Sequence, residues 1–183
     1  MSKVYVFLAD GFEEIEGLTV VDLMRRAGIE VTTVSIKEDT AIEGSHHILL
    51  RADTTFGSCD FSDADMLVLP GGGLGTKNLE KCEPLGKLVT SYCEKGGKIA
   101  AICAAPRVFA GLGLLNGKKA TCYPSVMEEL TGAVKSEDAV VVDGNITTSR
   151  GLGTAIDFSL ELITQLISKE KADEIAESVV YKR

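Results

Sequence analysis

The sequence predicts an α/β fold in which a mostly parallel central sheet is covered by helices on both faces and carries an antiparallel hairpin. Three observations lead to this prediction. Short apolar runs rich in β-forming residues alternate with segments of helical spacing along the chain. The apolar runs are nearly continuous, as in strands that are buried on both faces of a parallel sheet. The run 139–150 contains Asp143-Gly144-Asn145, whose residues tolerate the positive φ angles of a hairpin turn.

The first half of the chain predicts four strands and two helices. The segment 3–9 is apolar throughout, and the helical spacing that follows Asp10-Gly11 predicts a helix that ends at Gly28. The segment 65–70 predicts a buried strand because it is apolar and stops at Pro70 before three glycines. The expected elements are strands at 3–9, 30–36, 47–56 and 65–70, and helices at 13–28 and 77–95.

The second half continues the alternation and ends in helix. Pro124 is placed to begin a helix, because proline fits the first turn. The expected elements are strands at 98–103 and 118–122, helices at 105–112 and 124–132, the hairpin at 139–150, and a helix from 154 to the end with a break near Ser168. No linker, internal repeat or low-complexity segment interrupts this pattern, and the length is usual for one domain. We therefore expect a single domain over residues 1–183.

Composition and charge limit the classes of function. The net charge of -8 and the pI near 4.8 disfavour a nucleic-acid partner, since such proteins usually present a basic face. No stretch is long and apolar enough to cross a membrane, and the N-terminal residues lack a signal-peptide pattern, so we expect a cytoplasmic protein. The cysteines are odd in number and contain no C-x-x-C pair, which argues against a disulfide framework and a zinc site. We expect five free thiols, at Cys59, Cys82, Cys93, Cys103 and Cys122.

The glycine-rich segments do not predict a nucleotide site. Neither "PGGGLGTKN" nor "GLGLLNGKK" has the spacing of a phosphate-binding loop or of a dinucleotide-binding turn. Two interpretations of the first segment remain open. It forms a tight turn, or it lacks side chains so that backbone N–H groups can face a developing oxyanion.

Cys103 is the candidate nucleophile. Ligands of parallel sheets bind beyond the carboxyl ends of the strands, where "ADGFEE", "LPGGGLG" and "ICAAP" are expected to meet. The stretch Ala101-Ile102-Cys103-Ala104-Ala105 has the small-x-nucleophile-x-small form of a strand-to-helix elbow. At such an elbow the helix N-terminus favours a thiolate, and the Ala104 N–H can donate to an oxyanion. The alternative is a small buried hydrophobic residue, which we favour for the other four cysteines.

A carboxyl group is the expected partner of this thiol. His46 and His47 are adjacent and are expected to face solvent rather than to act in catalysis. Glu16 shares a helical stripe with Val20, Leu23 and Ala27, so it should be buried. Burial would raise its pKa, so that a protonated Glu16 could give Cys103 a hydrogen bond. A structural glutamate that bonds a backbone group remains the alternative.

Four motifs resemble the ThiJ/PfpI superfamily, in particular the branch of the Parkinsonism-associated protein deglycase and its bacterial relatives. They are "ADGFEEIE", "VLPGGG", "AAICAAP" and "TSRGLGT", in that order and over most of the chain. The resemblance implies a flavodoxin-like three-layer αβα sandwich, a homodimer, an elbow cysteine at Cys103 and a protonated Glu16. It also implies an oxyanion pocket formed by the backbone of Gly72 and Ala104.

The chain departs from this family at Tyr123. Many members carry a histidine in a T-x-H-P-like stretch, and here Thr121-Cys122-Tyr123-Pro124 places a tyrosine there. A tyrosine is a poor base at neutral pH but a serviceable hydrogen-bond donor. A protease triad of cysteine, histidine and a carboxylate is therefore disfavoured.

The resemblance implies an enzyme of the glyoxalase or deglycase type. The Cys103 thiolate would attack the aldehyde of methylglyoxal, or of its early adduct on a protein or nucleotide, with no metal and no organic cofactor. The alternative is an oxidative-stress sensor or redox-regulated chaperone in which Cys103 is oxidised. A cysteine peptidase or a protein associated with thiazole biosynthesis is a less favoured interpretation. We expect the pKa of Cys103 to lie well below the roughly 8.5 of a free thiol.

Overall fold

The computed structural model describes residues 2–182 and has a seven-stranded central sheet with the strand order β10-β11-β7-β6-β1-β2-β5. All neighbouring strands are parallel except the β10–β11 hairpin, which confirms the predicted fold class. The strands of this sheet are β1 (Lys3–Leu8), β2 (Glu30–Ser35), β5 (Thr54–Thr55), β6 (Met66–Leu69), β7 (Lys98–Ile102), β10 (Val140–Asp143) and β11 (Ile146–Ser149).

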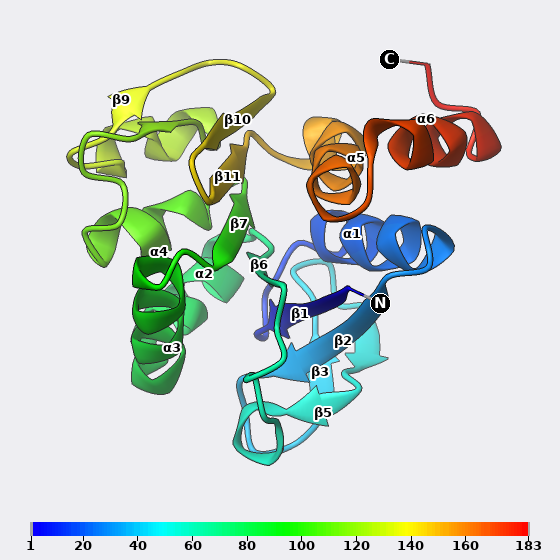
Figure 1. Ribbon diagram of the computed structural model, residues 1–183. Coiled ribbons are helices and arrows are strands. Elements are labelled where there is room, and N and C mark those ends of the chain that lie inside the picture. The colour runs from blue at the N-terminus through cyan, green and yellow to red at the C-terminus, as the bar shows by residue number, and fades with distance from the viewer. Residues whose placement is uncertain (1, 183) are drawn as a thin grey trace.

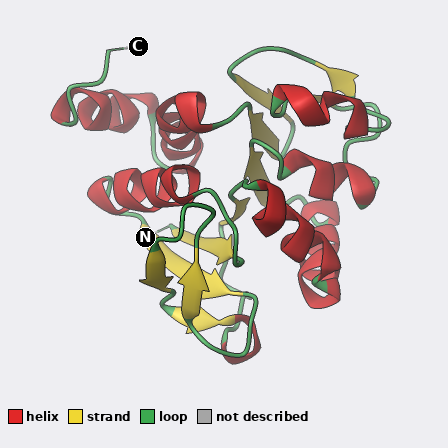
Figure 2. Ribbon diagram, turned by 180° about the vertical axis from the view of Figure 1, so that it is seen from behind, coloured by secondary structure: helices red, strands yellow, loops and turns green. Residues whose placement is uncertain are grey.

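Helices cover both faces of the sheet (Figures 1 and 2). One face packs on α1 (Glu14–Arg26), α5 (Ala155–Leu166) and α6 (Lys169–Ser178). The other packs on α2 (Gly73–Lys81), α3 (Glu83–Glu94) and α4 (Pro106–Gly111). Alternate residues of β1 enter the two cores, with Val6 on the α1 side and Phe7 on the opposite side, as the two-residue period of a strand requires. The central strands are therefore apolar along their whole length.

The predicted helix at 77–95 is wrong in extent, because the structure has two helices there. α2 begins earlier, at Gly73 within the glycine run, and ends at Lys81. Cys82 leaves the helical region with φ -80° and ψ 86°, and α3 starts directly afterwards with Pro84 in its first turn. Proline has no N–H and cannot continue a helix from the preceding turn, but it fits the first turn of a new one. The break therefore follows from Pro84.

The predicted strand at 47–56 is also divided. β4 (Leu49–Arg51) pairs with β3 (Ala41–Glu43) in a separate antiparallel hairpin that the sequence did not predict, and only β5 joins the central sheet. Between them the Asp53 carboxylate accepts hydrogen bonds from the N–H and hydroxyl of Thr33 at 2.8 and 2.7 Å. These bonds anchor the segment to β2 at the point where the strand is interrupted.

The C-terminal half differs from the sequence prediction in smaller ways. The expected helix at 124–132 is a 3-10 helix, η2 (Pro124–Glu129), and the expected strand at 118–122 is only β8 (Lys119–Ala120), paired in parallel with β9 (Val134–Lys135). The break near Ser168 is confirmed, because its hydroxyl accepts the Lys171 N–H at the start of α6. The remaining short 3-10 helices are η1 (Phe56–Ser58) and η3 (Leu152–Thr154).

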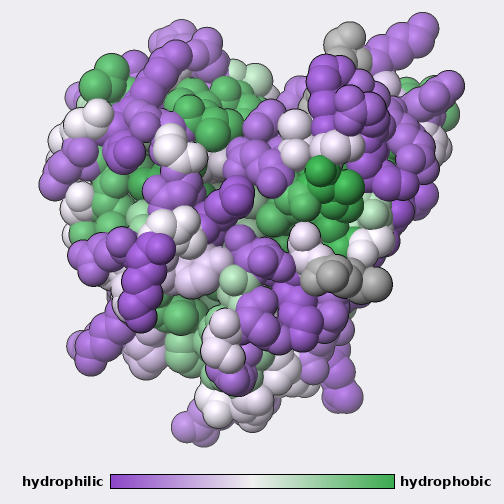
Figure 3. Space-filling view, in the orientation of Figure 1, coloured by the Kyte–Doolittle hydropathy of each residue, from purple (hydrophilic) through white to green (hydrophobic). Residues whose placement is uncertain are grey.

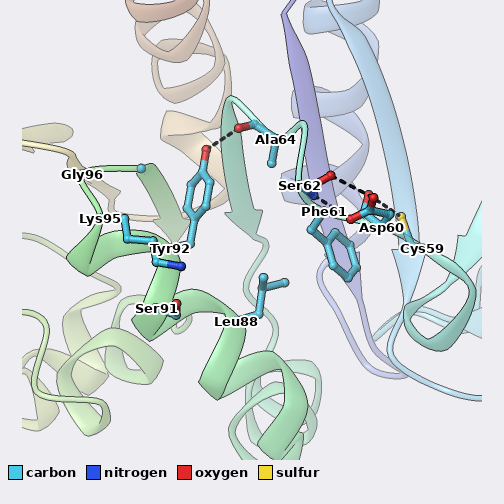
Figure 4. A pocket seen from close by; sticks show the side chains of 11 residues that line it. Cys59, Asp60, Phe61, Ser62, Ala64, Leu88, Ser91, Tyr92, Lys95 and Gly96 are labelled. Atoms are coloured by element: carbon cyan, nitrogen blue, oxygen red, sulfur yellow. Dashed lines mark hydrogen bonds between the residues drawn. The ribbon is translucent and has the colours of Figure 1, made fainter.

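The face shown in Figure 3 is largely hydrophilic, with separate apolar patches. None of the helices within residues 2–182 has the length and apolar character that a bilayer span requires. A cavity of about 780 Å³ lies between the loop before β6 and the end of α3. Phe61, Leu88 and Tyr92 line it, and the Tyr92 hydroxyl donates to the Ala64 carbonyl at 2.8 Å (Figure 4). It is at the amino ends of β6 and β7, so it is remote from the edge where the candidate site forms.

Candidate active site

Cys103 lies at a sharp turn directly after β7. Its φ of 65° is in the left-handed region, which residues other than glycine rarely occupy. Two backbone hydrogen bonds hold this conformation: the Cys103 N–H donates to the Ser149 carbonyl at 3.0 Å, and the Tyr123 N–H donates to the Cys103 carbonyl at 2.8 Å. Ala101 and Ala105 beside the turn are fully buried. The structure therefore has the strained elbow that the small residues predicted.

Glu16 reaches the sulfur of Cys103 from the first turn of α1. Its side chain is 1% exposed, and it forms a hydrogen bond with the thiol. The Gly71 N–H donates to Glu16 Oε2 at 3.1 Å, and the Leu152 N–H forms a second backbone hydrogen bond with the carboxyl group. Glu16 thus binds backbone groups and also contacts the candidate nucleophile.

Gly71 and Gly72 bring the backbone between β6 and α2 up to this pair. A Cβ on Gly71 would lie 2.5 Å from Cys103 Cβ and 2.5 Å from Glu16 Oε2. Gly72 has a φ of 95°, and a Cβ there would collide with the backbone around Phe12. The Gly72 N–H forms a hydrogen bond with the Cys103 sulfur, as does the Ala104 N–H. The glycine run is therefore both a tight turn and a source of a backbone donor.

The pKa of Glu16 is raised by burial, as the sequence predicted, whereas the pKa of Cys103 differs from the sequence prediction. Burial raises the pKa of Glu16 to about 7. The hydrogen bond from Cys103 lowers this pKa, and the charge of Glu13 raises it further. Burial raises the pKa of Cys103 to about 12, together with the charge and hydrogen bond of Glu16; the N–H groups of Gly72 and Ala104 lower it. The expected low pKa of Cys103 is thus contradicted. The sequence indicated the helix start and the neighbouring carboxyl group, but not the extent to which burial of the sulfur raises its pKa.

A carboxyl and a thiol in contact titrate as a pair. Between its two ionisations the pair carries one negative charge and one proton, which can lie on either group. With the proton on sulfur, Glu16 is a carboxylate next to a thiol. With the proton on Glu16, the sulfur is a thiolate that receives N–H hydrogen bonds from Gly72 and Ala104. Glu16 can therefore act as the base that ionises Cys103.

Tyr123 lies at the edge of this site. It is 48% exposed, and its ring passes beside Gly151, where an added Cβ would lie 3.4 Å from Tyr123 Cδ2 and 3.7 Å from Glu16 Oε1. Its backbone N–H is bonded to Cys103. The phenol is therefore on the same side of the molecule as the carboxyl group and near it.

The histidines face solvent, as expected. The Nδ1 atom of His46 lies 3.1 Å from Glu14 Oε2, and that of His47 lies 2.6 Å from Glu43 Oε1. Donor atoms of Glu13, Glu14 and His46 lie within 4.8 Å of one another, a spacing that could suit a metal ion. Burial alone would raise the pKa of Glu14, but hydrogen bonds from its own backbone, His46 and Ser45 lower it to about 2. This carboxylate thus already has protein donors.

Two contacts of the site, Gly71 and the backbone of Leu152, were not among the residues predicted from the sequence. The signal for Gly71 was present, because it is the first residue of the glycine run after β6, but only the fold shows which glycine meets Cys103. Leu152 lies in the "TSRGLGT" motif, but that motif does not indicate that the Leu152 N–H contacts Glu16, which is in a distant part of the chain. The four remaining cysteines are free thiols, and three of them have a pKa raised first by burial: Cys59, Cys93 and Cys122.

Comparison with known proteins identifies the family. The model of the DJ-1/PfpI family matches residues 2–165. The chain belongs to the DJ-1/PfpI family. The protein DJ-1 homolog B of Arabidopsis thaliana is 42% identical over 182 residues, which cover 98% of this chain and 42% of that protein. The chain thus spans less than half the length of this plant relative.

Two further members are similar over nearly their whole length. The glutathione-independent glyoxalase DJ-1 of Schizosaccharomyces pombe is 34% identical over 189 residues, with 98% of each protein covered. The structure of oxidized DJ-1 from Toxoplasma gondii matches with a TM-score of 0.96 and 34% identity, covering 100% of both chains. The predicted resemblance and the αβα architecture are both confirmed.

The packing of Gly71 predicts a steric effect on the pair. In Gly71→Ala, the methyl group would force Cys103 and Glu16 apart, so we expect the rate of Cys103 alkylation by iodoacetamide at neutral pH to fall about tenfold or more. The matched control is Gly73→Ala, whose methyl would meet no atom within 4 Å. The measurement is the loss of the free Cys103 thiol by mass spectrometry. Equal alkylation rates in the two variants would contradict the described contact.

Proposed function

We propose that this protein is a glyoxalase- or deglycase-type enzyme that uses Cys103 and Glu16 on small 2-oxoaldehydes. The observation that carries the proposal is the hydrogen bond between a strained elbow cysteine and a buried carboxyl whose pKa is raised to about 7. A base of this strength is matched to neutral pH. The fission yeast relative, named a glutathione-independent glyoxalase, supports this choice over other thiol chemistry.

The first step on methylglyoxal would form a carbon–sulfur bond. Cys103 Sγ attacks the aldehyde carbon while its proton moves to Glu16. The developing oxyanion accepts hydrogen bonds from the N–H groups of Gly72 and Ala104, which face the sulfur. Glu16 then returns its proton to this oxygen, and a hemithioacetal results. Tyr123, at the edge of the site, would donate a hydrogen bond to the neighbouring ketone oxygen.

The remaining steps are an internal rearrangement and a hydrolysis. Glu16 removes the hydrogen of the former aldehyde carbon as a proton, which leaves an enediolate, and then delivers that proton to the neighbouring carbon. The hydroxyl proton on the former aldehyde carbon moves to the oxygen of the former ketone, and a thioester of lactate results. Water cleaves the thioester and releases lactate and the Cys103 thiol. One carbon is oxidised and its neighbour is reduced, so no external oxidant is required. An early adduct on a protein or nucleotide would present the same carbon atoms.

We also propose a homodimer and a reducing compartment such as the cytoplasm. The exposed apolar side chains of Ile15 and Leu18 on α1, and of Ile48 and Leu49 at β4, favour a subunit contact. The two segments are neighbours, because the His46 N–H donates to Glu14 at the start of α1. The free thiols among the described cysteines support the compartment.

Conversion of methylglyoxal to lactate without glutathione is the direct test of the proposed activity. We expect the wild type to produce lactate, Cys103→Ser to abolish production, and Glu16→Gln to lower kcat by about 10²- to 10⁴-fold through loss of the base. Cys82→Ser, at the break between α2 and α3, is the control and should keep full activity. Lactate production by Cys103→Ser at the wild-type rate would refute the mechanism.

The raised pKa of Glu16 also predicts the pH dependence. A base must be unprotonated, so kcat/KM should fall about tenfold per pH unit below pH 7 and level off above it, in line with the Glu16 pKa of about 7. The measurement is the initial rate of lactate formation across this pH range. A rate that is already level two pH units below 7 would show that a different group is the base.

A redox sensor is the second candidate, favoured by the oxidized form in which Toxoplasma gondii DJ-1 has been solved. Peroxide would oxidise Cys103 to a sulfenic and then a sulfinic acid, with one water released in each step. The sulfinate would accept the hydrogen bonds of Gly72, Ala104 and a protonated Glu16.

Mass spectrometry after mild peroxide treatment tests this second role. We expect Cys103 to be oxidised before the other four cysteines, because Glu16 is in contact with its thiol and can take up the proton. Glu16→Gln should remove this preference. Uniform oxidation of all five thiols in the wild type would exclude a sensor based on Cys103.

A further inference from the structure

Three helical segments begin around Cys103. α2 starts after Gly72, whose N–H bonds the sulfur, and α4 starts after Ala104, whose N–H does the same. η2 starts after Tyr123, whose N–H donates to the Cys103 carbonyl at 2.8 Å. The donors at the candidate nucleophile therefore keep their positions only if these three segments keep theirs.

One guanidinium group joins all three segments away from the sulfur. Arg107, in the first turn of α4, donates from Nε and Nη2 to the two carboxylate oxygens of Glu80 on α2, each at 2.7 Å. Its Nη1 donates to Glu129 Oε2 on η2 at 2.9 Å. Figure 1 shows α2 and α4 side by side. This guanidinium is thus the common contact of the three segments.

The geometry of this contact is that of a strong ion pair. The Arg107 side chain is only 16% exposed, and both oxygens of Glu80 are engaged in a fork that an ammonium group cannot reproduce. Arg107 is also close to the elbow along the chain, since its backbone N–H donates to the Ala104 carbonyl at 3.2 Å. A shift of the Arg107 guanidinium would therefore also move the turn at Cys103, because Arg107 is bonded to Ala104, the residue after Cys103.

We infer that Arg107 is a positioning residue, which fixes α2, α4 and η2 so that the backbone N–H groups of Gly72, Ala104 and Tyr123, which lie just before these segments, converge on Cys103. Arg107 itself does not need to touch the substrate. The inference uses the proposed function only in taking Cys103 as the reactive group. It adds a residue that lies outside the four motifs of the sequence, next to the "AAICAAP" motif.

Arg107→Lys tests this inference because it keeps the positive charge and removes the fork. We expect alkylation of Cys103 by iodoacetamide at neutral pH to slow by about tenfold, and the midpoint of its pH dependence to rise by about one unit, because the N–H donors move away from the sulfur. Arg25→Lys is the matched control. Arg25 also forms an ion pair, with Asp53, and donates a hydrogen bond to the Val31 carbonyl. It lies in the last turn of α1, at the end of the helix opposite to Glu16. It should leave the alkylation profile unchanged.

Glu129→Gln is the second variant, since this carboxylate is half-exposed and its loss should leave the protein folded. It removes one of the three contacts, so we expect a smaller decrease in the alkylation rate, about twofold to threefold. The melting temperature is measured for each variant. If Arg107→Lys and Glu129→Gln lower the melting temperature but keep the wild-type alkylation rate and midpoint, the contact is only structural and the inference is wrong.

Alkylation separates this inference from the proposed function. A wild-type protein that makes no lactate would refute the glyoxalase proposal, but a slowed and shifted alkylation of Cys103 in Arg107→Lys would still support the positioning role. Conversely, lactate production with unchanged alkylation in both variants would leave the glyoxalase proposal intact and refute the role of Arg107.

Discussion

The site depends on the proton shared by Cys103 and Glu16. Burial makes a charge on either group costly, so the pair gains its single negative charge near pH 7 and holds it at higher pH. Fixed backbone donors surround both positions of that charge, with Gly72 and Ala104 at the sulfur and Gly71 and Leu152 at the carboxyl group. The proton can therefore move between the groups without a large rearrangement of the protein. This property makes one pair suitable for nucleophilic attack and for repeated proton transfer.

The fold places the two groups together through long-range contacts. Glu16 comes from the helix after β1, Gly71 and Gly72 from the turn after β6, and Cys103 from the turn after β7. These strands are neighbours and parallel, so their carboxyl ends lie at the same edge of the sheet. The strained φ of Cys103 is maintained by hydrogen bonds to two further segments. The hydrogen bonds that hold the elbow thus come from several segments at the edge of the sheet where the carboxyl ends of the strands lie.

The sequence was sufficient for the features that depend on local pattern. Small residues around Cys103 predicted the elbow, and the apolar stripe of α1 predicted that Glu16 is buried. It was insufficient where distant residues decide the outcome. The pKa of Cys103 depends on enclosure by three segments, the interruption of the strand at Asp53 depends on Thr33, and the role of Arg107 depends on Glu80 and Glu129. The division of the helix at 77–95 had a local signal that was missed, which is Pro84.

The pH dependence of Cys103 alkylation in the wild type and in Glu16→Gln measures the shared proton most directly. If the pair carries one charge above its first ionisation, the wild-type rate should rise with a midpoint near pH 7, the pKa of Glu16. In Glu16→Gln this rise should be absent, because Cys103 then has no base. A wild-type rate that rises only near pH 12, the pKa of Cys103, would contradict the account. So would identical profiles for the two proteins.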